Sequence, residues 1–207
     1  MPLQSRVSPF GDLFADSSRG LFYGNRGGRF HRDDHTLSAR RWASRAWICC
    51  LLSFKGRHRE VWGKGFTGLI FLDEVTALAA GHRPCFECRR KDAEAFAMLW
   101  PGSRKRKERA RAAAMDVVLQ AERLVGRNKR RHRMAIDDLP DGTCIVIPDD
   151  DKQAGMIRGN KLLHWTSEGY APARQRPRGI SVDVLTPPSI LIVLKAGYQP
   201  VWHPSAD

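Results

Sequence analysis

After residue 30, the first part of the chain contains short apolar runs separated by glycine and polar residues. Residues 46–54 form a run of apolar, β-branched and aromatic side chains, which predicts a buried strand. Residues 59–62 and 66–72 predict two further strands, and the Gly-Lys-Gly sequence at 63–65 between them indicates a hairpin.

The pattern then changes to a helical period. Asp73 is suited to cap the start of a short helix, Gly81 to end it in a left-handed conformation, and Pro84 follows shortly after. A second helix is expected from about Lys91 to the Pro-Gly sequence at 101–102. Its apolar positions recur at helical spacing and predict a core-facing stripe made of Ala93, Phe96, Ala97 and Trp100.

Residues 112–125 are rich in helix-forming side chains and lie between two clusters of basic residues. This segment predicts an amphipathic central helix with basic ends. One apolar face is expected to contain Ala114, Val118, Ala121 and Val125, with Val117 and Leu124 beside it.

The last third of the chain has short β-type runs separated by turn residues. Residues 143–147, 161–165, 180–185 and 190–194 predict strands of a small antiparallel β barrel or sheet. The chain is therefore expected to be an α+β protein. An N-terminal β-hairpin and helix domain with the basic helix would occupy residues 1–133, and a small all-β domain residues 134–207.

Positive charge is concentrated in one part of the sequence. The chain has 35 Lys and Arg residues against 22 Asp and Glu residues, a formal net charge of +13. Residues 104–133 alone hold twelve basic and three acidic residues, so most of the excess lies there. Such a tract predicts binding to the phosphates of nucleic acid. The expected contacts are Arg83, Arg89, Arg90, Arg104, Lys105, Arg106, Lys107, Arg111, Arg127, Lys129, Arg130, Arg131 and Arg133.

A membrane surface, an acidic protein partner, or a solvated helix without a ligand would also account for the basic tract. A membrane partner is disfavoured because the apolar face lacks Trp and Phe, and no run approaches the roughly 20 apolar residues of a membrane span. The N-terminus has no apolar core of a secretory signal. We therefore expect a cytoplasmic, nucleoid-associated protein with no membrane partner.

Five cysteines in such a compartment argue against a disulfide framework. The Cys-x-x-Cys sequence at 85–88 has the spacing of a zinc knuckle, and Cys49 with Cys50 is a second pair upstream. Adjacent residues of a strand point to opposite faces, so both bind one ion only if the strand ends or bulges there. The expected ligands of a structural Zn²⁺ are Cys49, Cys50, Cys85 and Cys88. If only one of the upstream pair binds, a histidine completes the site, from His31, His35, His58 or His82. Buried hydrophobic cysteines and a redox dithiol are the alternatives, and Cys144 is expected in the core.

The run from Glu74 to Arg90 resembles the end of the Ada-type metal-binding domain of bacterial methylphosphotriester repair proteins. The similarity is centred on Ala77–Cys88, where a helix leads into Ala-Gly-x-Arg-Pro-Cys-x-x-Cys-Arg. It implies a four-cysteine zinc site on a DNA-binding scaffold. The first cysteine pair departs from the family, in which three residues separate the two cysteines, so methyl transfer to Cys49 or Cys50 is not expected. The whole chain also resembles a bacterial family marked by Gly24-Asn-Arg-Gly27, Phe71-Leu-Asp-Glu74 and Leu185-Thr-Pro-Pro188, which implies no chemistry.

A cluster of potential catalytic groups lies in residues 31–35. Asp33 and Asp34 offer oxygen ligands for Mg²⁺, and His31 or His35 could activate water for attack on a phosphodiester. The arrangement loosely resembles the histidine-bearing hairpin of His-Asn-His nucleases. A polar loop without catalytic function is the alternative.

Together these patterns predict a zinc-containing DNA-processing protein, foremost a metal-dependent endonuclease in a damage or repair context. A non-catalytic DNA-binding protein built on an Ada-like zinc domain is the second hypothesis. An RNA-binding module that uses the C-terminal barrel is the third.

Overall fold

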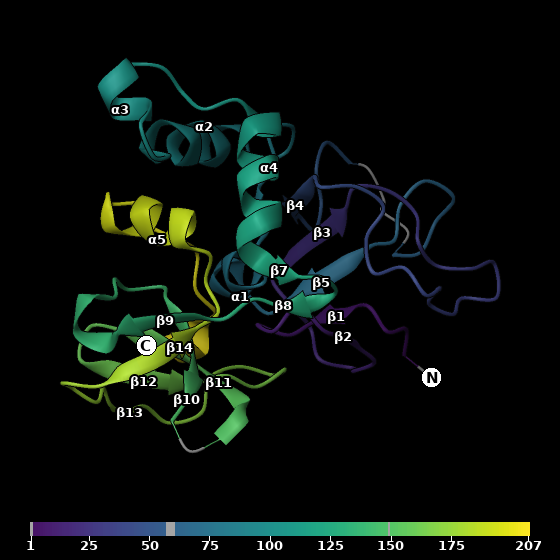
Figure 1. Cartoon of the computed structure of the whole chain (residues 1–207). Coiled ribbons are helices and arrows are strands. Elements are labelled where there is room, and N and C mark those ends of the chain that lie inside the picture. Colours follow the sequence, from purple (N-terminus) through teal and green to yellow (C-terminus); the bar gives the residue numbers. More distant parts are fainter. Residues whose placement is uncertain (1, 57–60, 149) are drawn as a thin grey trace.

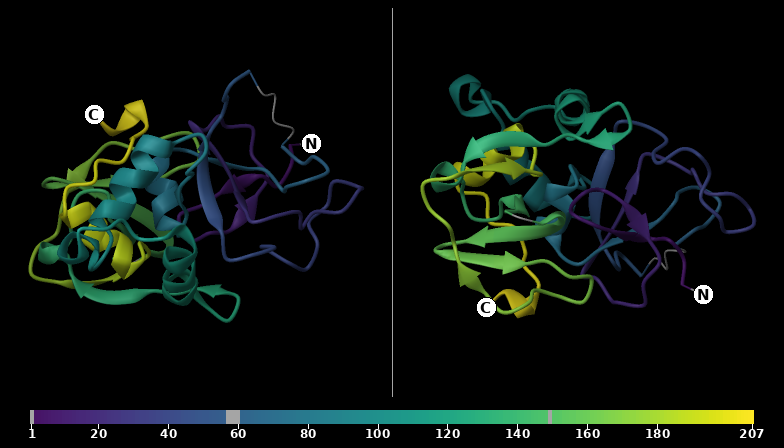
Figure 2. Two further views of the ribbon diagram at one scale, coloured as in Figure 1. Left: turned by 90° about the horizontal axis from the view of Figure 1, so that it is seen from above. Right: turned by 60° about the horizontal axis from the view of Figure 1, so that its bottom comes forward.

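The structure is a computed structural model that describes residues 2–56, 61–148 and 150–207, without the side chains of residues 104 and 106. It is an α+β protein with two six-stranded sheets at opposite ends of the molecule (Figures 1 and 2). Helix α1 (Glu74–Ala79) lies between them, and its residues contribute to the hydrophobic cores of both. This fold places Cys50 and Cys85 close to the β6 edge of the N-terminal sheet.

The N-terminal sheet is mixed and has the strand order β2-β1-β5-β3-β4-β6. Its strands are β1 (Arg6–Val7), β2 (Leu13–Phe14), β3 (Phe22–Arg26), β4 (Trp47–Leu51), β5 (Leu69–Phe71) and β6 (Arg83–Pro84). The pairs β1–β5 and β4–β6 are parallel, and the other pairs are antiparallel. The strand expected in residues 46–54 is confirmed as β4, and it lies near the edge that β6 closes.

Within the described residues, the hairpin expected from residues 59–62 and 66–72 is limited to one antiparallel bridge across the turn. Residues 59 and 60 lie outside the described residues, and Trp62 and Thr67 form only an isolated bridge. Strand β5 instead pairs with β3 on one side and with β1 on the other. The two partners of β5 are therefore distant in sequence, which a local turn pattern does not reveal.

Helices α1 and α2 (Arg90–Leu99) follow the sequence pattern. Asp73 accepts a 2.8 Å hydrogen bond from the backbone nitrogen of Thr76, as expected of an N-cap. Gly81 has a φ of +89°, and a Cβ there would lie 2.7 Å from the Arg123 side chain. The stripe expected on α2 is buried throughout.

Helix α4 (Ala112–Arg123) lies where a helix was expected, but the opposite face is buried. The core receives Met115 and Leu119, whereas Val117 and Val118 are 53% and 38% exposed. The expected apolar face was therefore wrong. The buried face also carries the charged residues Asp116 and Arg123, whose partners are distant in sequence.

The flanks of α4 are not helical extensions of it. The first basic cluster contains the single helical turn α3 (Ser103–Arg106), and Lys107 has a left-handed backbone with φ of +57°. The second cluster lies in a two-stranded hairpin and the next strand: β7 (Leu124–Val125), β8 (Asn128–Lys129) and β9 (His132–Ala135). The prediction of one long basic helix is therefore wrong, and a helix followed by a basic hairpin takes its place. Gly126 lies in the turn of this hairpin, with a φ of +60°.

The C-terminal sheet is antiparallel throughout, with the order β13-β12-β11-β10-β14-β9. Its further strands are β10 (Cys144–Ile147), β11 (Asp150–Arg158), β12 (Lys161–His164), β13 (Arg174–Gln175) and β14 (Ser181–Val184). Short 3₁₀ turns lie at Ile136–Asp138 and Pro204–Ala206. Strands expected at 143–147, 161–165 and 180–185 are confirmed. Asp150 and Asp151 begin β11, and Asp149 lies outside the described residues.

The apolar run at 190–194 is helical, which corrects the expected strand. It belongs to α5 (Pro188–Lys195), whose first helical residue is a proline, a favoured residue at that position. A short apolar run does not distinguish a strand from a buried helix, and here packing decides. Ile190 and Val193 enter the same hydrophobic cluster as Phe96 of α2 and Met115 of α4.

Candidate functional site

Three cysteine side chains converge beside the edge of the N-terminal sheet. Cys50 lies on β4, Cys85 directly follows β6, and Cys88 precedes α2. The parallel pairing of β4 with β6 brings these segments together, and the Cys85 nitrogen donates a 2.9 Å hydrogen bond to the Cys49 carbonyl. The three sulfur atoms lie within 4.8 Å of one another and are buried. This group of thiols could hold a metal ion.

The surroundings of the three sulfurs favour the thiolate form at Cys85. The backbone nitrogens of Leu51 and Glu87 each donate a 3.4 Å hydrogen bond to a sulfur, of Cys88 and Cys85 respectively. Hydrogen bonds from the thiols of Cys50 and Cys88 lower the pKa of Cys85, and the same close contact with Cys85, together with burial, raises the pKa of Cys50 and Cys88. Since metals bind thiolates rather than thiols, this donor set suits a thiophilic ion such as zinc.

Cys49 is not part of this group, which corrects the expected set of four cysteine ligands. It is fully buried in the cluster that contains Phe22 and Phe71, because successive side chains of β4 point to opposite faces of the sheet. Its sulfur accepts a 3.5 Å hydrogen bond from Arg89 Nη1, and burial raises its thiol pKa.

No histidine joins the three cysteines within the described part of the chain. His82 is buried against the rings of Trp47 and Phe71, at centroid distances of 5.0 and 4.7 Å. His31 and His35 lie in their own loop against Trp62. His58 lies outside the described residues. The described residues thus offer three protein ligands.

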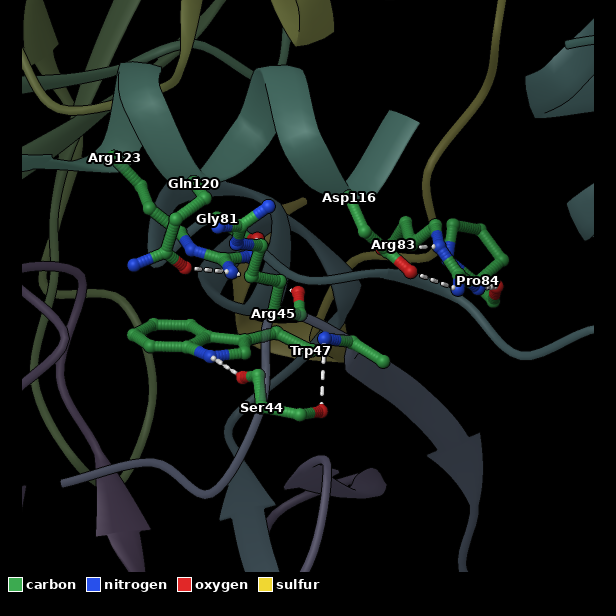
Figure 3. A network of polar contacts seen from close by, with 10 residues as sticks. Ser44, Arg45, Trp47, Gly81, Arg83, Pro84, Asp116, Gln120 and Arg123 are labelled. Carbon is green, nitrogen blue, oxygen red and sulfur yellow. Dashed lines mark hydrogen bonds and ion pairs between the residues drawn. The ribbon is translucent and has the colours of Figure 1, made fainter. Parts of the chain in front are cut away.

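Two of the arginines expected to contact nucleic acid are used inside the protein. Arg83 forms a two-pronged ion pair with Asp116 of α4, with both contacts at 2.8 Å (Figure 3). Arg89 is paired with Glu74 and Asp92 at 2.8 and 2.9 Å. Carboxylates inside the protein already pair with both guanidiniums, so neither is available to a phosphate. Their positions beside the Cys-x-x-Cys motif did not distinguish these two buried arginines from arginines on the surface.

The other expected contacts are more accessible. Arg90 is exposed and pairs with Glu94, and the side chains of Arg104 and Arg106 lie outside the described residues. The exposed residues are Lys105, Lys107, Arg111, Arg127, Arg131 and Arg133, while Lys129 and Arg130 are half-buried. Of these, Arg131 and Arg133 share one acidic partner, Asp183.

A basic cavity of about 680 Å³ opens next to the β7–β8 hairpin. Besides Arg127, Lys129 and Arg131, it is lined by Arg26 and Arg123, which no sequence pattern singled out. The glycine-rich context of Arg26 and the helical position of Arg123 carried no indication that the two would meet. Only the fold brings them to the same cavity.

The loop of residues 31–37 is tightly folded and uses its acidic groups internally. Asp34 accepts hydrogen bonds from the Thr36 nitrogen and hydroxyl at 2.9 and 2.7 Å, and Asp33 pairs with Arg29. His31 is buried, stacks on Trp62 at 5.2 Å, and has its Nδ1 2.8 Å from Thr67 Oγ1. Burial lowers the pKa of His31. The loop forms no candidate metal group within the described residues.

Comparison of the chain with protein-family models, with curated proteins and with solved structures gave no match. The resemblance to the Ada-type domain therefore rests on the motif of residues 77–88 alone. Among the helices of the described residues, none has both the length and the apolar character needed to cross a membrane.

Proposed function

We propose that this protein binds DNA without cleaving it and that a structural zinc ion stabilises the fold beside the binding surface. The observation that carries the proposal is the basic surface formed by the β7–β8 hairpin and β9. It presents Arg127, Arg131 and Arg133 to solvent, with Asp183 as their one acidic partner among the described residues. Exposed basic residues that outnumber acidic ones are suited to bind the phosphates of the DNA backbone. Such contacts position a protein on the duplex without recognising its base sequence.

Zinc is the metal we assign to Cys50, Cys85 and Cys88. Three thiolates match its preference for sulfur ligands, and one further ligand would complete the tetrahedral set of a structural site. The ion would connect β4 to the start of α2 and so hold the sheet edge against the helices. In this proposal the metal stabilises the fold, and the arginines bind the DNA.

Metal content tests the zinc assignment. Cys85→Ser should lose bound zinc, measured by elemental analysis of the purified protein, because it removes one of three clustered sulfurs. Cys49→Ala and Cys144→Ser are matched controls at buried cysteines outside the group, and both should keep one zinc per chain. Zinc retained in Cys85→Ser, or no zinc in the unaltered protein, contradicts the assignment. A His58→Ala variant tests separately whether that histidine takes part.

Salt dependence and charge variants test DNA binding. Affinity for a duplex oligonucleotide should fall steeply between 50 and 200 mM salt, as counterion release requires. Arg127→Ala/Arg131→Ala should weaken binding and flatten the slope of log affinity against log salt by about two. Lys161→Ala/Arg174→Ala removes the same charge at the opposite edge of the C-terminal sheet and serves as control. An equal loss in both variants would show that net charge, not this surface, determines binding, and competition with duplex RNA separates the RNA-binding alternative.

A metal-dependent endonuclease is the second candidate, and one observation favours it. His31 and His35 line a depression of about 520 Å³ together with Arg29, Arg32 and Lys64, where a phosphate could approach. The carboxylates of Asp33 and Asp34 are engaged within the loop, which disfavours a Mg²⁺ site. Plasmid incubated with protein and Mg²⁺ should therefore stay supercoiled. Nicking that EDTA and a His31→Ala/His35→Ala variant abolish would instead establish the nuclease.

A further inference from the structure

The basic cavity beside the β7–β8 hairpin has an excess of positive charge that the protein itself does not balance. Its walls come from residues 10–13, β3, residues 39–42, the end of α4 and the hairpin. Six cations of the described residues line it: Arg26, Arg41, Arg123, Arg127, Lys129 and Arg131. Asp12 is the one acidic residue among these described lining residues.

Two of these cations are buried without a carboxylate partner among the described residues. Arg26 is 2% exposed and donates to the carbonyls of Gly11 and Arg41, at 2.8 and 3.3 Å, and to His82 Nε2. Arg123 is fully buried and donates to the carbonyls of Gly81 and Arg45, at 2.9 and 2.8 Å (Figure 3). The Nε of Arg123 has no hydrogen-bond partner in the described part of the chain. Neutral groups hold both guanidiniums in place, and Asp12 and Asp116 compensate their charges only from a distance, without a hydrogen bond.

The contrast with Arg83 shows that this arrangement is specific to the cavity. Arg83 is similarly buried, but Asp116, about two turns before Arg123 on α4, neutralises it (Figure 3). Burying a charge without a counter-charge is costly. Burial, and repulsion from neighbouring guanidiniums, lower the pKa of both Arg26 and Arg123 to about 9. A bound anion would remove this cost.

Two tryptophans complete the walls. The guanidinium carbons of Arg26 and Arg123 lie 4.0 and 3.9 Å from the ring centroid of Trp47. Trp42, which is half-buried, lies 5.9 Å from Trp47 between ring centroids. Because Trp47 is 2% exposed, Trp42 is the ring of this pair on which the flat base of an anionic ligand would stack.

We propose that this cavity binds the terminal phosphate of a nucleotide or of a 5′-phosphorylated DNA strand. A phosphate monoester carries nearly two negative charges at neutral pH, whereas a backbone phosphate carries one, so the monoester balances two buried guanidiniums better. The volume of about 680 Å³ is in the range of pockets for small ligands and accommodates a nucleotide. The cavity shares Arg127 and Arg131 with the hairpin surface, but a free nucleotide would enter it whether or not that surface binds DNA.

Quenching of tryptophan fluorescence in phosphate-free buffer tests the proposal on the full-length protein. Inorganic phosphate and deoxyadenosine 5′-monophosphate should each bind, and deoxyadenosine, which lacks the phosphate, should bind at least about tenfold more weakly. A 5′-phosphorylated oligonucleotide that binds about tenfold more tightly than its 5′-hydroxyl counterpart identifies the strand end as the source. Equal binding of the two oligonucleotides, together with monophosphate binding, identifies the free nucleotide. If neither phosphate nor the monophosphate binds, the proposal is wrong, even where both oligonucleotides bind through the hairpin surface.

Charge variants locate the bound phosphate. Arg26→Met and Arg123→Met should each reduce monophosphate affinity at least about tenfold. Arg26 and Arg123 also stabilise the fold, so their variants can unfold. The variant Arg41→Ala/Arg127→Ala, at the exposed rim, carries a lower risk of unfolding and should also bind the monophosphate more weakly. Lys161→Ala/Arg174→Ala, remote from the cavity, should bind the monophosphate like the unaltered protein. An affinity unchanged in the rim variant, with circular dichroism confirming the fold, would overturn the assignment.

Discussion

Buried arginines in this protein differ in how their charge is compensated. Arg83 has a carboxylate partner with two-pronged geometry, and the hydrogen-bond partners of Arg26 and Arg123 among the described residues are carbonyls, an imidazole nitrogen and an amide. The first arrangement is typical of an internal structural clamp. The second leaves charge available to an anion. Residue type alone does not separate the two cases, because all three are arginines that end up inside the protein.

The Arg83–Asp116 pair yields a stability prediction at the residue scale. Asp116→Ala should lower the free energy of unfolding by about 3–5 kcal/mol, since it leaves a buried guanidinium without its partner. Arg83→Met/Asp116→Leu should recover most of that loss, because both charges are then gone. Urea unfolding of the two variants and the unaltered protein measures the difference. Equal destabilisation in the single and the double variant would show that packing, not charge, governs the site.

Lys129 yields a prediction about pH. Burial, and then repulsion from Arg123 and Arg26, lower its pKa to about 7, from 10.5 in the unfolded chain, while Asp12 and the Cys144 thiol oppose the shift. Between these values the unfolded chain binds a proton that the folded chain does not. The free energy of unfolding should therefore rise with pH across this window. Lys129→Met should remove this contribution, which denaturant unfolding at pH 7 and pH 9 detects as a smaller gain than in the unaltered protein.

At the scale of elements, helix α4 shows why an apolar pattern can mislead. Its valines at 117 and 118 form one apolar strip, and Met115 and Leu119 form another that shares its face with Asp116 and Arg123. A prediction made from the apolar positions alone assigns the face with charged residues to the solvent. The ion pair with Arg83 and the carbonyls of Gly81 and Arg45 make burial of those charges possible.

Substitutions on the two faces of α4 should therefore differ sharply. Leu119→Ala should lower the free energy of unfolding by about 2–5 kcal/mol, because it opens a cavity in the cluster with α2 and α5. Val118→Ala, on the exposed face, should change it by less than about 1 kcal/mol. Chemical unfolding of both variants gives the comparison. Similar losses would indicate that the exposed valines pack against something in solution.

At the scale of the whole molecule, two acidic residues at the start of α1 connect this helix to the C-terminal part of the chain. Asp73 accepts hydrogen bonds from Tyr170 Oη and the His203 nitrogen, at 2.6 and 3.0 Å. Glu74 accepts from Tyr198 Oη and the Val201 nitrogen, at 2.7 and 3.0 Å, besides its ion pair with Arg89. The N-terminal half thus places its helix-capping residues directly against the C-terminal tail.

This connection predicts one cooperative unfolding transition. Two hydrophobic clusters contain residues from both sides of position 134, so neither half has a complete core without the other. Thermal unfolding should show a single transition whether it is followed by calorimetry or by tryptophan fluorescence. A fragment of residues 1–133 should lack a cooperative transition altogether. Two separate transitions in the full chain would instead support two independent domains.

The sequence by itself determined the features that depend on neighbours along the chain. The Asp73 cap, the left-handed Gly81, the buried stripe of α2 and the paired thiols of Cys85 and Cys88 follow from local spacing, which fixes local backbone geometry. The tertiary structure alone decided the features that depend on distant partners. It selected Cys50 rather than Cys49 as the third sulfur, because strand pairing sets which side of β4 faces the Cys-x-x-Cys turn. It also turned residues 190–194 into a helix, paired Arg83 with Asp116, and brought Arg26 and Arg123 to one cavity. Side chains so far apart in sequence meet only when the sheets and helices pack, and local patterns do not record that packing.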